Sequence, residues 1–385
     1  MSIGIGGAGS KLASLLDHGN ATIVNVSEIE LSKVEASNKI LAVTHSSRGQ
    51  FKGSGRNPEI GKTAFVSISD ELYSLVKGNT VFSSTGGGTG NGISSIILKK
   101  IAEADSVHLL DRTMFGLLLP YVNRESSEFV ENTIQFLLDP VSSAIDSGNT
   151  GNMVLFSNKL KFEARIAEAD YNHMMIRSLQ NFLDIPFKGE SLQLLDGHID
   201  HEDFNVYKSK PYFNHFTQFF YDTHRPFGDQ LRENFNQLLL PPERSIEAMF
   251  LLEVPQVEQA PMLYNILDYF AEDDVTPAYG VVHNPNIEQP TVTVSLLYSR
   301  KPRELVDDFK QMADKLTRKK IKKSIEQFVK LEATPFDIQS EVKQMTTPPP
   351  VQEGETPIPP PEVEKVAATE GNDVFSVLKR LRKLK

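Results

Sequence analysis

Short apolar runs alternate with longer amphipathic segments along the first half of the chain. Apolar, β-branched and aromatic residues cluster in six runs that predict strands, at residues 2–5, 22–26, 41–43, 80–82, 114–119 and 153–156. Apolar residues at helical spacing predict helices from Lys11 to Leu16 and over residues 93–101. A regular alternation of strands and helices is typical of an α/β fold with a parallel sheet.

The pattern changes in the second half. Apolar positions from about Asp170 to Leu183 predict one long helix, and the chain from residue 245 onward predicts a smaller α+β unit. A second long helix is expected from Pro302, with acidic residues early and basic residues late, as the helix dipole favours. The smaller unit should contain strands at 246–253, 278–283 and 291–298 and a helix over 262–270.

Composition limits the classes of protein to which the chain can belong. Its 385 residues suffice for two domains with full cores, and its net charge of −10 argues against wholesale nucleic-acid binding. It has no cysteine, which excludes disulfides, thiolate catalysis and cysteine-bound zinc. No apolar run approaches the roughly 20 residues of a membrane span, and the first residues do not read as a secretory leader. We therefore expect a cytoplasmic protein.

A glycine-rich stretch follows the strand predicted at 80–82. Residues 86–92 contain five glycines in seven positions, and the helix predicted at 93–101 begins directly after them. Strand, glycine loop and helix together direct backbone N–H groups and a helix N-terminus at a phosphate group. An ordinary glycine-rich turn is the alternative interpretation.

Two further loops favour the phosphate interpretation. The sequence GGAGS at residues 6–10 follows the first strand, and residues 4–9 formally match a dinucleotide fingerprint. A hydride-transfer enzyme would not need the second glycine loop, so a Rossmann dehydrogenase is the weaker alternative. A third loop, residues 53–62, contains Asn57-Pro58 and should start a helix.

These loops resemble those of the tubulin/FtsZ superfamily. GGGTGNG at residues 86–92 is very similar to the family's GGGTG[ST]G loop, with Asn91 in place of the usual Ser or Thr. GGAGS resembles the family's first nucleotide loop. The Arg56-Asn57-Pro58 sequence of the third loop, and the long helix after Pro302, look closest to the TubZ and phage-tubulin branch.

The resemblance implies a polymerising cytoskeletal GTPase. The expected fold is a parallel Rossmann-like GTPase sheet, a long central helix, a smaller α+β activation domain and a C-terminal helix with a disordered tail. The expected ligands are GTP and GDP, with Mg²⁺ bridging the phosphates, and the expected partner is the chain itself, head to tail in filaments. Positioning of plasmid or phage DNA is the expected role. An FtsZ-like division ring and a non-polymerising GTP-binding regulator are the alternatives.

The resemblance also implies which residues contact the nucleotide. Glu125 lies in the place of the ribose-side loop, and Asn158 and Asp170 lie where the family reads guanine. A carboxylate or amide oxygen can accept from guanine N1–H and N2–H₂, a donor pair that adenine lacks. Ile166 lies where FtsZ often has a phenylalanine that stacks on the base. The phosphate loops and the third loop would supply Gly6, Gly7, Ala8, Gly9, Ser10, Asn57, Gly86, Gly87, Gly88, Thr89, Gly90 and Asn91.

Acidic residues and histidines cluster at residues 197–204, after the central helix. A metal site and a solvated acidic turn are two interpretations of this composition. The spacing of Asp200 and Asp203 also allows both carboxylates to lie on one face of a helical turn. Together with Phe204 they resemble the family's synergy loop, which implies that both acids are catalytic and polarise the attacking water in the nucleotide pocket of the next subunit. His198 lies where FtsZ has Asn.

The C-terminal residues have a different character. Residues 346–372 contain seven prolines and five glutamates, which is typical of a disordered linker. Residues 373–385 are basic and amphipathic, so their expected contact is acidic: DNA with its adaptor protein, a filament neighbour or an anionic membrane. The expected segments are a GTP-binding domain 1–168, central helix and connection 169–196, synergy loop and following helical segment 197–244, activation domain 245–300, C-terminal helix 301–345, linker 346–372 and tail 373–385.

Overall fold

The computed structural model describes residues 1–47, 49–242 and 244–299, and six residues beyond them, Asp307, Lys310, Gln311, Asp314, Thr317 and Arg318. All belong to the first of two compact units, Met1–Lys323 and Ser324–Lys385. The six are helical and fall within the helix expected at 301–345. The linker expected at 346–372 and the tail expected at 373–385 lie outside the described residues. Among the described helices, none combines the length and apolar character that crossing a membrane requires.

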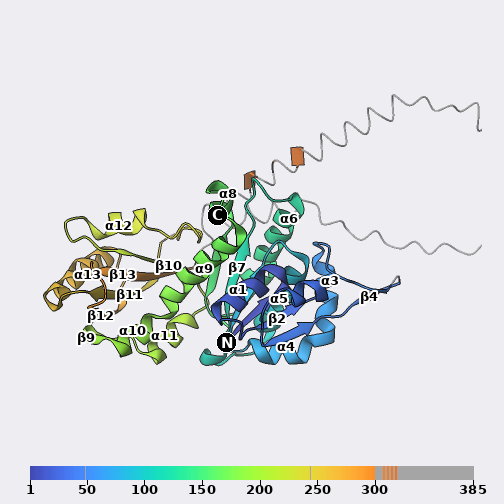
Figure 1. Ribbon diagram of the computed structural model, residues 1–385, viewed down its shortest axis with the longest axis horizontal. Helices are drawn as coiled ribbons and strands as arrows, with labels where there is room; N and C mark the ends of the chain where they lie inside the picture. Colours follow the sequence, from blue (N-terminus) through green and yellow to red (C-terminus); the bar gives the residue numbers. More distant parts are fainter. Residues whose placement is uncertain are drawn as a thin grey trace, which may run out of the picture. The chain divides into compact units, whose positions relative to one another are not determined.

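One eleven-stranded sheet runs through the described unit, in the order β3-β2-β1-β6-β7-β8-β10-β13-β11-β12-β9 (Figure 1). The first seven strands are mutually parallel, whereas β13 is antiparallel to both of its neighbours and β9 is antiparallel to β12. A separate short hairpin is formed by β4 (His45–Ser46) and β5 (Gly49–Gln50). The sheet consists of β1 (Ser2–Ile5), β2 (Thr22–Asn25), β3 (Asn38–Leu41), β6 (Thr80–Ser84), β7 (Met114–Leu119), β8 (Met153–Ser157), β9 (Gln193–Gly197), β10 (Phe213–Phe220), β11 (Glu247–Val254), β12 (Ala278–His283) and β13 (Thr291–Tyr298).

Helices connect the parallel strands, and the longest of the later ones, α9, lies between the two halves of the unit (Figure 1). The α-helices are α1 (Gly6–Leu16), α2 (Glu28–Ser32), α3 (Pro58–Phe65), α4 (Ser69–Val76), α5 (Gly88–Glu103), α6 (Ser127–Phe136), α7 (Ser142–Asp146), α8 (Lys159–Glu163), α9 (Glu168–Leu183), α10 (Ile185–Ser191), α11 (His201–Lys208), α12 (Phe227–Glu233) and α13 (Leu263–Glu272). Short 3₁₀ turns are η1 (Val66–Ile68), η2 (Leu109–Asp111) and η4 (Val257–Met262), and η3 (Leu137–Val141) is a π-helical turn. The predicted α/β class, with a parallel sheet, a long central helix and a later α+β part, is confirmed.

Both faces of the parallel part are buried, which explains the continuous apolar run of β7. Successive side chains of a strand point to opposite faces. Phe115 and Leu117 join the core cluster that contains residues of α3, α4 and α5. Met114 and Leu118 join a second cluster that contains residues of α1 and α9. A strand covered on both sides cannot alternate apolar and polar residues, so its composition alone identifies it.

Strand β10 joins the two halves of the sheet, within residues 197–244, where the sequence predicts the synergy loop and a following helical segment. All eight residues of β10 pair with β13, but only Phe213 and Asn214 pair with β8. The sequence FNHFTQFF places polar residues in the core, and partners far along the chain satisfy them. Asn214 Nδ2, for example, donates to Asn152 Oδ1 at 2.7 Å. Such tertiary contacts leave no local periodicity to detect.

Two other boundaries differ from the prediction. α1 and α5 begin at Gly6 and Gly88, within the glycine loops rather than after them. Glycine is a weak helix former, so these first turns depend on packing between the two helices. The third strand occupies residues 38–41 instead of 41–43. It is an edge strand that pairs only with β2, and its first two residues are exposed and polar, which removes the apolar signal.

Candidate functional site

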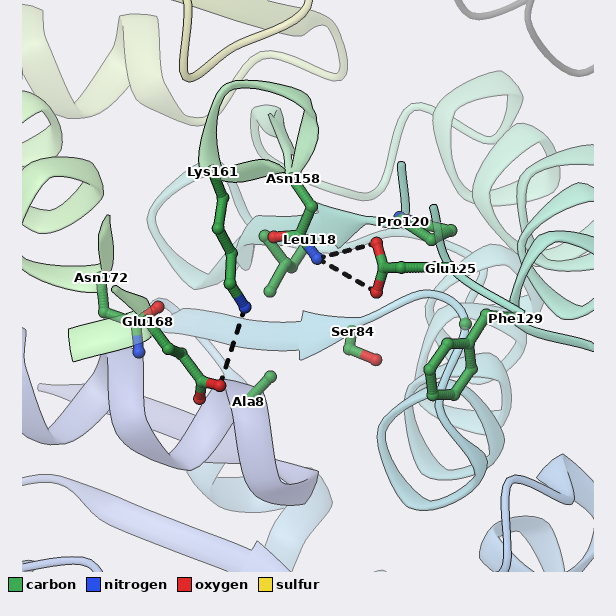
Figure 2. A pocket seen from close by; sticks show the side chains of 11 residues that line it. Ala8, Ser84, Leu118, Pro120, Glu125, Phe129, Asn158, Lys161, Glu168 and Asn172 are labelled. Atoms are coloured by element: carbon green, nitrogen blue, oxygen red, sulfur yellow. Dashed lines mark hydrogen bonds and ion pairs between the residues drawn. The ribbon is translucent and has the colours of Figure 1, made fainter. Parts of the chain in front are cut away.

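A cavity of about 180 Å³ lies where β1, β6, β7 and β8 end and their connecting loops begin (Figure 2). Parallel strands place their carboxyl ends along one edge, where open α/β sheets bind ligands. Each of the four loops is one that the sequence analysis assigns to a nucleotide. The cavity is lined by Ala8, Ser84, Gly86, Leu118, Pro120, Glu125, Phe129, Asn158, Lys161, Glu168 and Asn172.

The two glycine loops touch each other beside this cavity. Gly6 has φ of +74°, and a Cβ atom built on it would lie only 2.8 Å from Gly90 N. A Cβ on Gly9 would lie 2.2 Å from Phe82 O, because α1 packs directly on β6. Glycine is therefore required for the N-termini of α1 and α5 to approach this closely.

Both helix N-termini are left open for an anion. Neither α1 nor α5 has a side-chain cap at its start, and neither has an acidic residue in its first turn. The first N–H groups of a helix have no partner within the helix, and they carry a partial positive charge. Two such N-termini side by side are suited to binding phosphate oxygens.

The third loop packs against the start of α5. A Cβ on Gly88 would lie 2.5 Å from Ser54 Oγ and 2.8 Å from Asn57 N. The Asn57 side chain caps α3, since its Oδ1 accepts from Glu59 N at 3.0 Å. The backbone of Asn57 therefore lies beside the N-terminus of α5, while its side chain is engaged in the cap.

Asn91 is buried behind the glycine loop and does not line the cavity. Its Nδ2 donates to Thr85 O at 2.5 Å and to Asn132 O at 3.1 Å. Asn132 Nδ2 in turn donates to Gly86 O and to Arg56 O, both at 3.0 Å. These bonds connect the central glycine loop, the third loop and α6, so Asn91 positions the loop instead of contacting a ligand.

Glu125 and Asn158 both line the cavity, and their side chains contact each other (Figure 2). Asn158 Nδ2 donates to Glu125 Oε2 at 3.2 Å, and Tyr121 N donates to the same oxygen at 2.6 Å. Burial raises the pKa of the Glu125 carboxyl above its ordinary value, against the lowering effect of these two hydrogen bonds. Arg124, its neighbour, is exposed and does not line the cavity. Of these two neighbours, the acid is thus the one that lines the cavity.

Another wall of the cavity contains a group of charges, Lys161 and Glu168, which a third charge, Lys11, joins from α1. Lys161 lies 3.7 Å from the carboxylate of Glu168 of α9 (Figure 2). Lys11 of α1 forms an ion pair with the same carboxylate at 2.5 Å. The hydrogen bond from Lys11 is the largest cause of a lowered pKa at Glu168. The sequence contains no signal for this group, because the three residues come from three different helices.

Asp170 lies on the exposed side of α9 and does not line the cavity. Glu168 and Asn172 line it instead (Figure 2). Residues four apart share a face of a helix, and a residue two positions along points well away from it. Asn172 is only 7% exposed, and its amide forms no hydrogen bond with other residues of the described part of the chain. A buried, unpaired amide facing a cavity is a candidate ligand-reading group.

Asp200 and Asp203 lie together, at the other end of α9 from the cavity. Asp200 caps α11, and its Oδ1 accepts from Asp203 N at 2.8 Å. α9 has sixteen residues, which corresponds to ~24 Å, and Glu168 at its start lines the cavity. Phe182, near its end, packs against Phe204 of α11. The two acids are therefore separated from the cavity of their own chain by about the length of this helix.

The histidines of the same cluster do not gather around these acids. His201 Nδ1 lies 2.6 Å from Glu190 Oε1 of α10. In the described part of the chain, no group of three or more His, Cys, Asp or Glu side chains is arranged to hold a metal ion.

The chain is similar to known proteins at the level of structure only. No family model and no curated protein sequence matches the chain. Solved structures match it over most of its length. CetZ from Methanosaeta thermophila strain DSM 6194 superposes with a TM-score of 0.62 at 16% identity, covering 89% of this chain and 98% of that one. The fold is that of the tubulin/FtsZ superfamily.

Two other solved structures match in the same way. A GTPγS-form protofilament of TubZ from Bacillus thuringiensis serovar israelensis gives a TM-score of 0.65 at 14% identity, covering 83% of this chain and 93% of that one. An FtsZ dimer from M. jannaschii gives 0.54 at 18% identity, covering 77% and 86%. Identities this low establish the tubulin/FtsZ fold and nothing finer. The fold expected from the glycine loops is thereby confirmed, and TubZ is among the proteins that share it.

Proposed function

We propose that this chain is a GTP-hydrolysing protein that polymerises head to tail, so that the acids of one subunit complete the cavity of the next. The separation of these two groups along α9 carries the proposal. Asp200 and Asp203 cannot reach the cavity of their own chain. Head-to-tail stacking would instead bring the acids of one subunit to the cavity of the next. The FtsZ dimer and the TubZ protofilament are assemblies of proteins with this fold, which supports self-association.

Phosphate binding is assigned to the open N-termini of α1 and α5. Backbone N–H groups from residues 6–10 and 86–90 would surround the phosphates. The close contact between Gly6 and Gly90 supports this assignment, because it makes the two N-termini one continuous surface. Glu125 would accept a hydrogen bond from a ribose hydroxyl, and its partner Asn158 would hold that carboxylate in place.

Guanine recognition is assigned to Asn172 together with Asn158, in place of the Asp170 predicted from the sequence. The Asn172 amide can accept from a guanine N–H and donate to O6, whereas adenine presents an amino group at the position of O6. Its burial supports the assignment, since an amide left unpaired in a closed site costs about 1–3 kcal/mol. Guanine would remove that cost by forming hydrogen bonds with the Asn172 amide.

The residues near the phosphate loops are compatible with Mg²⁺ bound through the nucleotide. A Cβ on Gly7 would lie 2.8 Å from Glu30 Oε2, so this carboxylate reaches the start of α1. Asn25 Nδ2 holds the same oxygen at 2.7 Å. Mg²⁺ commonly takes one or two carboxylates, several waters and substrate phosphates, which agrees with a single acid at this place. When bound, the ion would neutralise charge that develops on the phosphates.

The reaction assigned to the completed site is attack of water on the γ-phosphorus of GTP. An acid from the adjoining subunit would orient the water and accept its proton, as a general base does. Asp203 suits this role because its carboxylate is exposed at the first turn of α11. Asp200 suits a positioning role, since the hydrogen bond that it accepts from Asp203 N holds the first turn of α11 in place.

The cellular role we propose is the positioning of plasmid or phage DNA. It is supported by the likeness to TubZ filaments and by the basic residues 373–385, which would bind DNA with its adaptor protein. An FtsZ-like role in division and a non-polymerising regulator remain the alternatives.

Electron microscopy and phosphate release with GTP, GDP and ATP test the proposed function directly. Filaments and phosphate release are expected with GTP and not with ATP. GTP binding without any assembly, at concentrations up to those of an abundant cytoskeletal protein, would favour the regulator instead. Absence of GTP binding would refute the proposal.

A further inference from the structure

The described phosphate-binding segments supply dipoles but almost no positive side chains. Neither the loop at residues 6–10 nor the loop at residues 86–92 contains a lysine or arginine. Lys11 follows the first loop, but it is paired with Glu168. Lys62 of α3 is paired with Glu59. A nucleoside triphosphate carries several negative charges, and its hydrolysis shifts charge among the phosphate oxygens. Lys161, which lines the cavity, lies 3.7 Å from Glu168 Oε2. A further cation, Arg56, belongs to the third loop, which packs against the start of α5.

Arg56 is held in a position that borders the cavity. Its Cζ lies over the ring of Phe129, 5.2 Å from the ring centroid, and Phe129 lines the cavity. A Cβ on Gly86 would lie 2.9 Å from Phe129 Cβ, so Phe129, whose ring lies against the guanidinium, packs directly on the central glycine loop. Arg56 Nη1 also lies 3.5 Å from Glu128 Oε2.

The backbone of Arg56 is fixed, although its side chain is loosely held. Arg56 O accepts from Asn132 Nδ2, which also donates to Gly86 O, so one side chain fastens both loops. Arg56 has φ of +67°, a left-handed conformation that costs energy for most residues. Its side chain is 56% exposed. Exposed ion pairs and exposed cation–π contacts are weak, so a phosphate group can displace both.

We infer that Arg56 is a catalytic residue that acts within its own subunit, by leaving Phe129 and Glu128 to bind the γ-phosphate of GTP. This inference rests on the proposed function. A planar guanidinium can donate two parallel hydrogen bonds to phosphate oxygens, which a backbone N–H cannot. The same contact would distinguish GTP from GDP, because only GTP presents a γ-phosphate.

Arg56 undergoes no chemical change during the proposed hydrolysis. The water oxygen forms a bond to the γ-phosphorus, and the bond from that phosphorus to the bridging β-phosphate oxygen breaks. GDP leaves with the electron pair of the broken bond, and the proton of the water passes to the acid of the adjoining subunit. Arg56 stays protonated and stabilises charge on the γ-phosphate oxygens during transfer.

The test compares Arg56→Asn with wild type. Asparagine adopts the left-handed conformation more readily than most residues, so this variant preserves the loop. GTPγS and GDP affinities are measured by competition with a fluorescent nucleotide, and phosphate release is measured at equal filament mass. GDP affinity should stay within about twofold of wild type, whereas GTPγS affinity should fall roughly tenfold or more, as expected for a lost charge-assisted contact. Phosphate release should fall at least about tenfold.

Lys62→Gln is the matched control, because it removes one positive charge six residues along the chain and should leave both affinities and phosphate release unchanged. Arg56→Lys should recover part of the preference for GTPγS over GDP, since it restores the charge without the planar fork. An unchanged GTPγS-to-GDP affinity ratio in Arg56→Asn would overturn the inference. Loss of GDP binding would overturn it too, by making Arg56 a structural residue. If wild type binds no GTP, the proposed function itself fails.

Discussion

The ring of Phe182 lies 4.9 Å from the ring of Phe204, which joins the end of α9 to the beginning of α11. Phe182 also stacks on Phe216 of β10 at 5.1 Å, with the two rings nearly parallel. α9 is thus fixed at one end to the acidic helix and the sheet, while its other end lines the cavity through Glu168 and Asn172. The distance between the cavity and the acids is therefore set by a packed element of constant length.

The first prediction concerns the two acids. Asp203→Asn should abolish most GTP turnover while leaving GTP binding and filament formation intact, because it removes a proton acceptor and not a ligand of the nucleotide. Asp200→Asn should reduce turnover and keep the stability of the protein, since asparagine caps a helix as well as aspartate does. Phosphate release, sedimentation and thermal unfolding distinguish these effects.

The same site predicts how turnover depends on concentration. If one subunit completes the site of the next, phosphate release per molecule should rise steeply above the concentration at which filaments appear. Equal turnover per molecule at all concentrations would contradict an active site shared between subunits.

The second prediction concerns the base. Asn172→Ala should weaken GTP binding roughly ten- to hundredfold, because it removes a buried partner of guanine. Asp170→Ala, two residues away on the exposed side of the same helix, is the matched control and should bind GTP as wild type does. The reverse result, with Asp170 sensitive and Asn172 tolerant, would restore the assignment made from sequence. Isothermal titration with GTP and ATP measures both.

The third prediction concerns acid stability. His215 is 1% exposed and donates from Nδ1 to Leu240 O at 2.9 Å, and burial lowers its pKa to about 4. Between that value and its ordinary pKa of about 6.5, the unfolded chain binds a proton that the folded chain does not. Stability should therefore fall as pH decreases through this window, by about 3 kcal/mol from this residue.

Urea unfolding at pH 7 and at pH 4.5 checks the contribution of His215. His215→Asn can keep the hydrogen bond to Leu240 O but cannot titrate. It should be less stable than wild type at pH 7, and the difference should shrink at pH 4.5. A constant difference at both pH values would show that His215 does not govern this loss.

The fourth prediction concerns residues 373–385. Deleting them should leave GTP turnover near that of wild type, because the expected contact of this basic segment is a partner and not the nucleotide. Filament bundling or attachment to DNA with its adaptor should weaken, and the loss should be larger at low salt, where charge interactions are least screened. If the truncated protein no longer polymerises, the segment belongs to the filament contact instead.

Local sequence patterns were sufficient to predict the elements that are largely buried and the loops in which glycine is required. The strands at 114–119, 278–283 and 291–298 have the predicted bounds, because each is a run of mostly apolar or β-branched residues covered by other elements. The glycines of residues 6–10 and 86–92 predicted the fold, since so close an approach of two helix N-termini tolerates no side chain.

Tertiary structure alone decided which side chains face the cavity. Glu168, Asn172, Lys161 and Glu125 meet there from separate elements, and the rotation of α9 about its own axis determines that Asn172 enters while Asp170 does not. That rotation is set by the apolar residues of α9 packing on α1 and the sheet. Similarly, β10 is a strand because β8 and β13 lie on either side of it. By itself the sequence determined the fold and its closely packed glycine loops, which depend on local steric limits, whereas the lining of the cavity depends on packing between residues far apart in the chain.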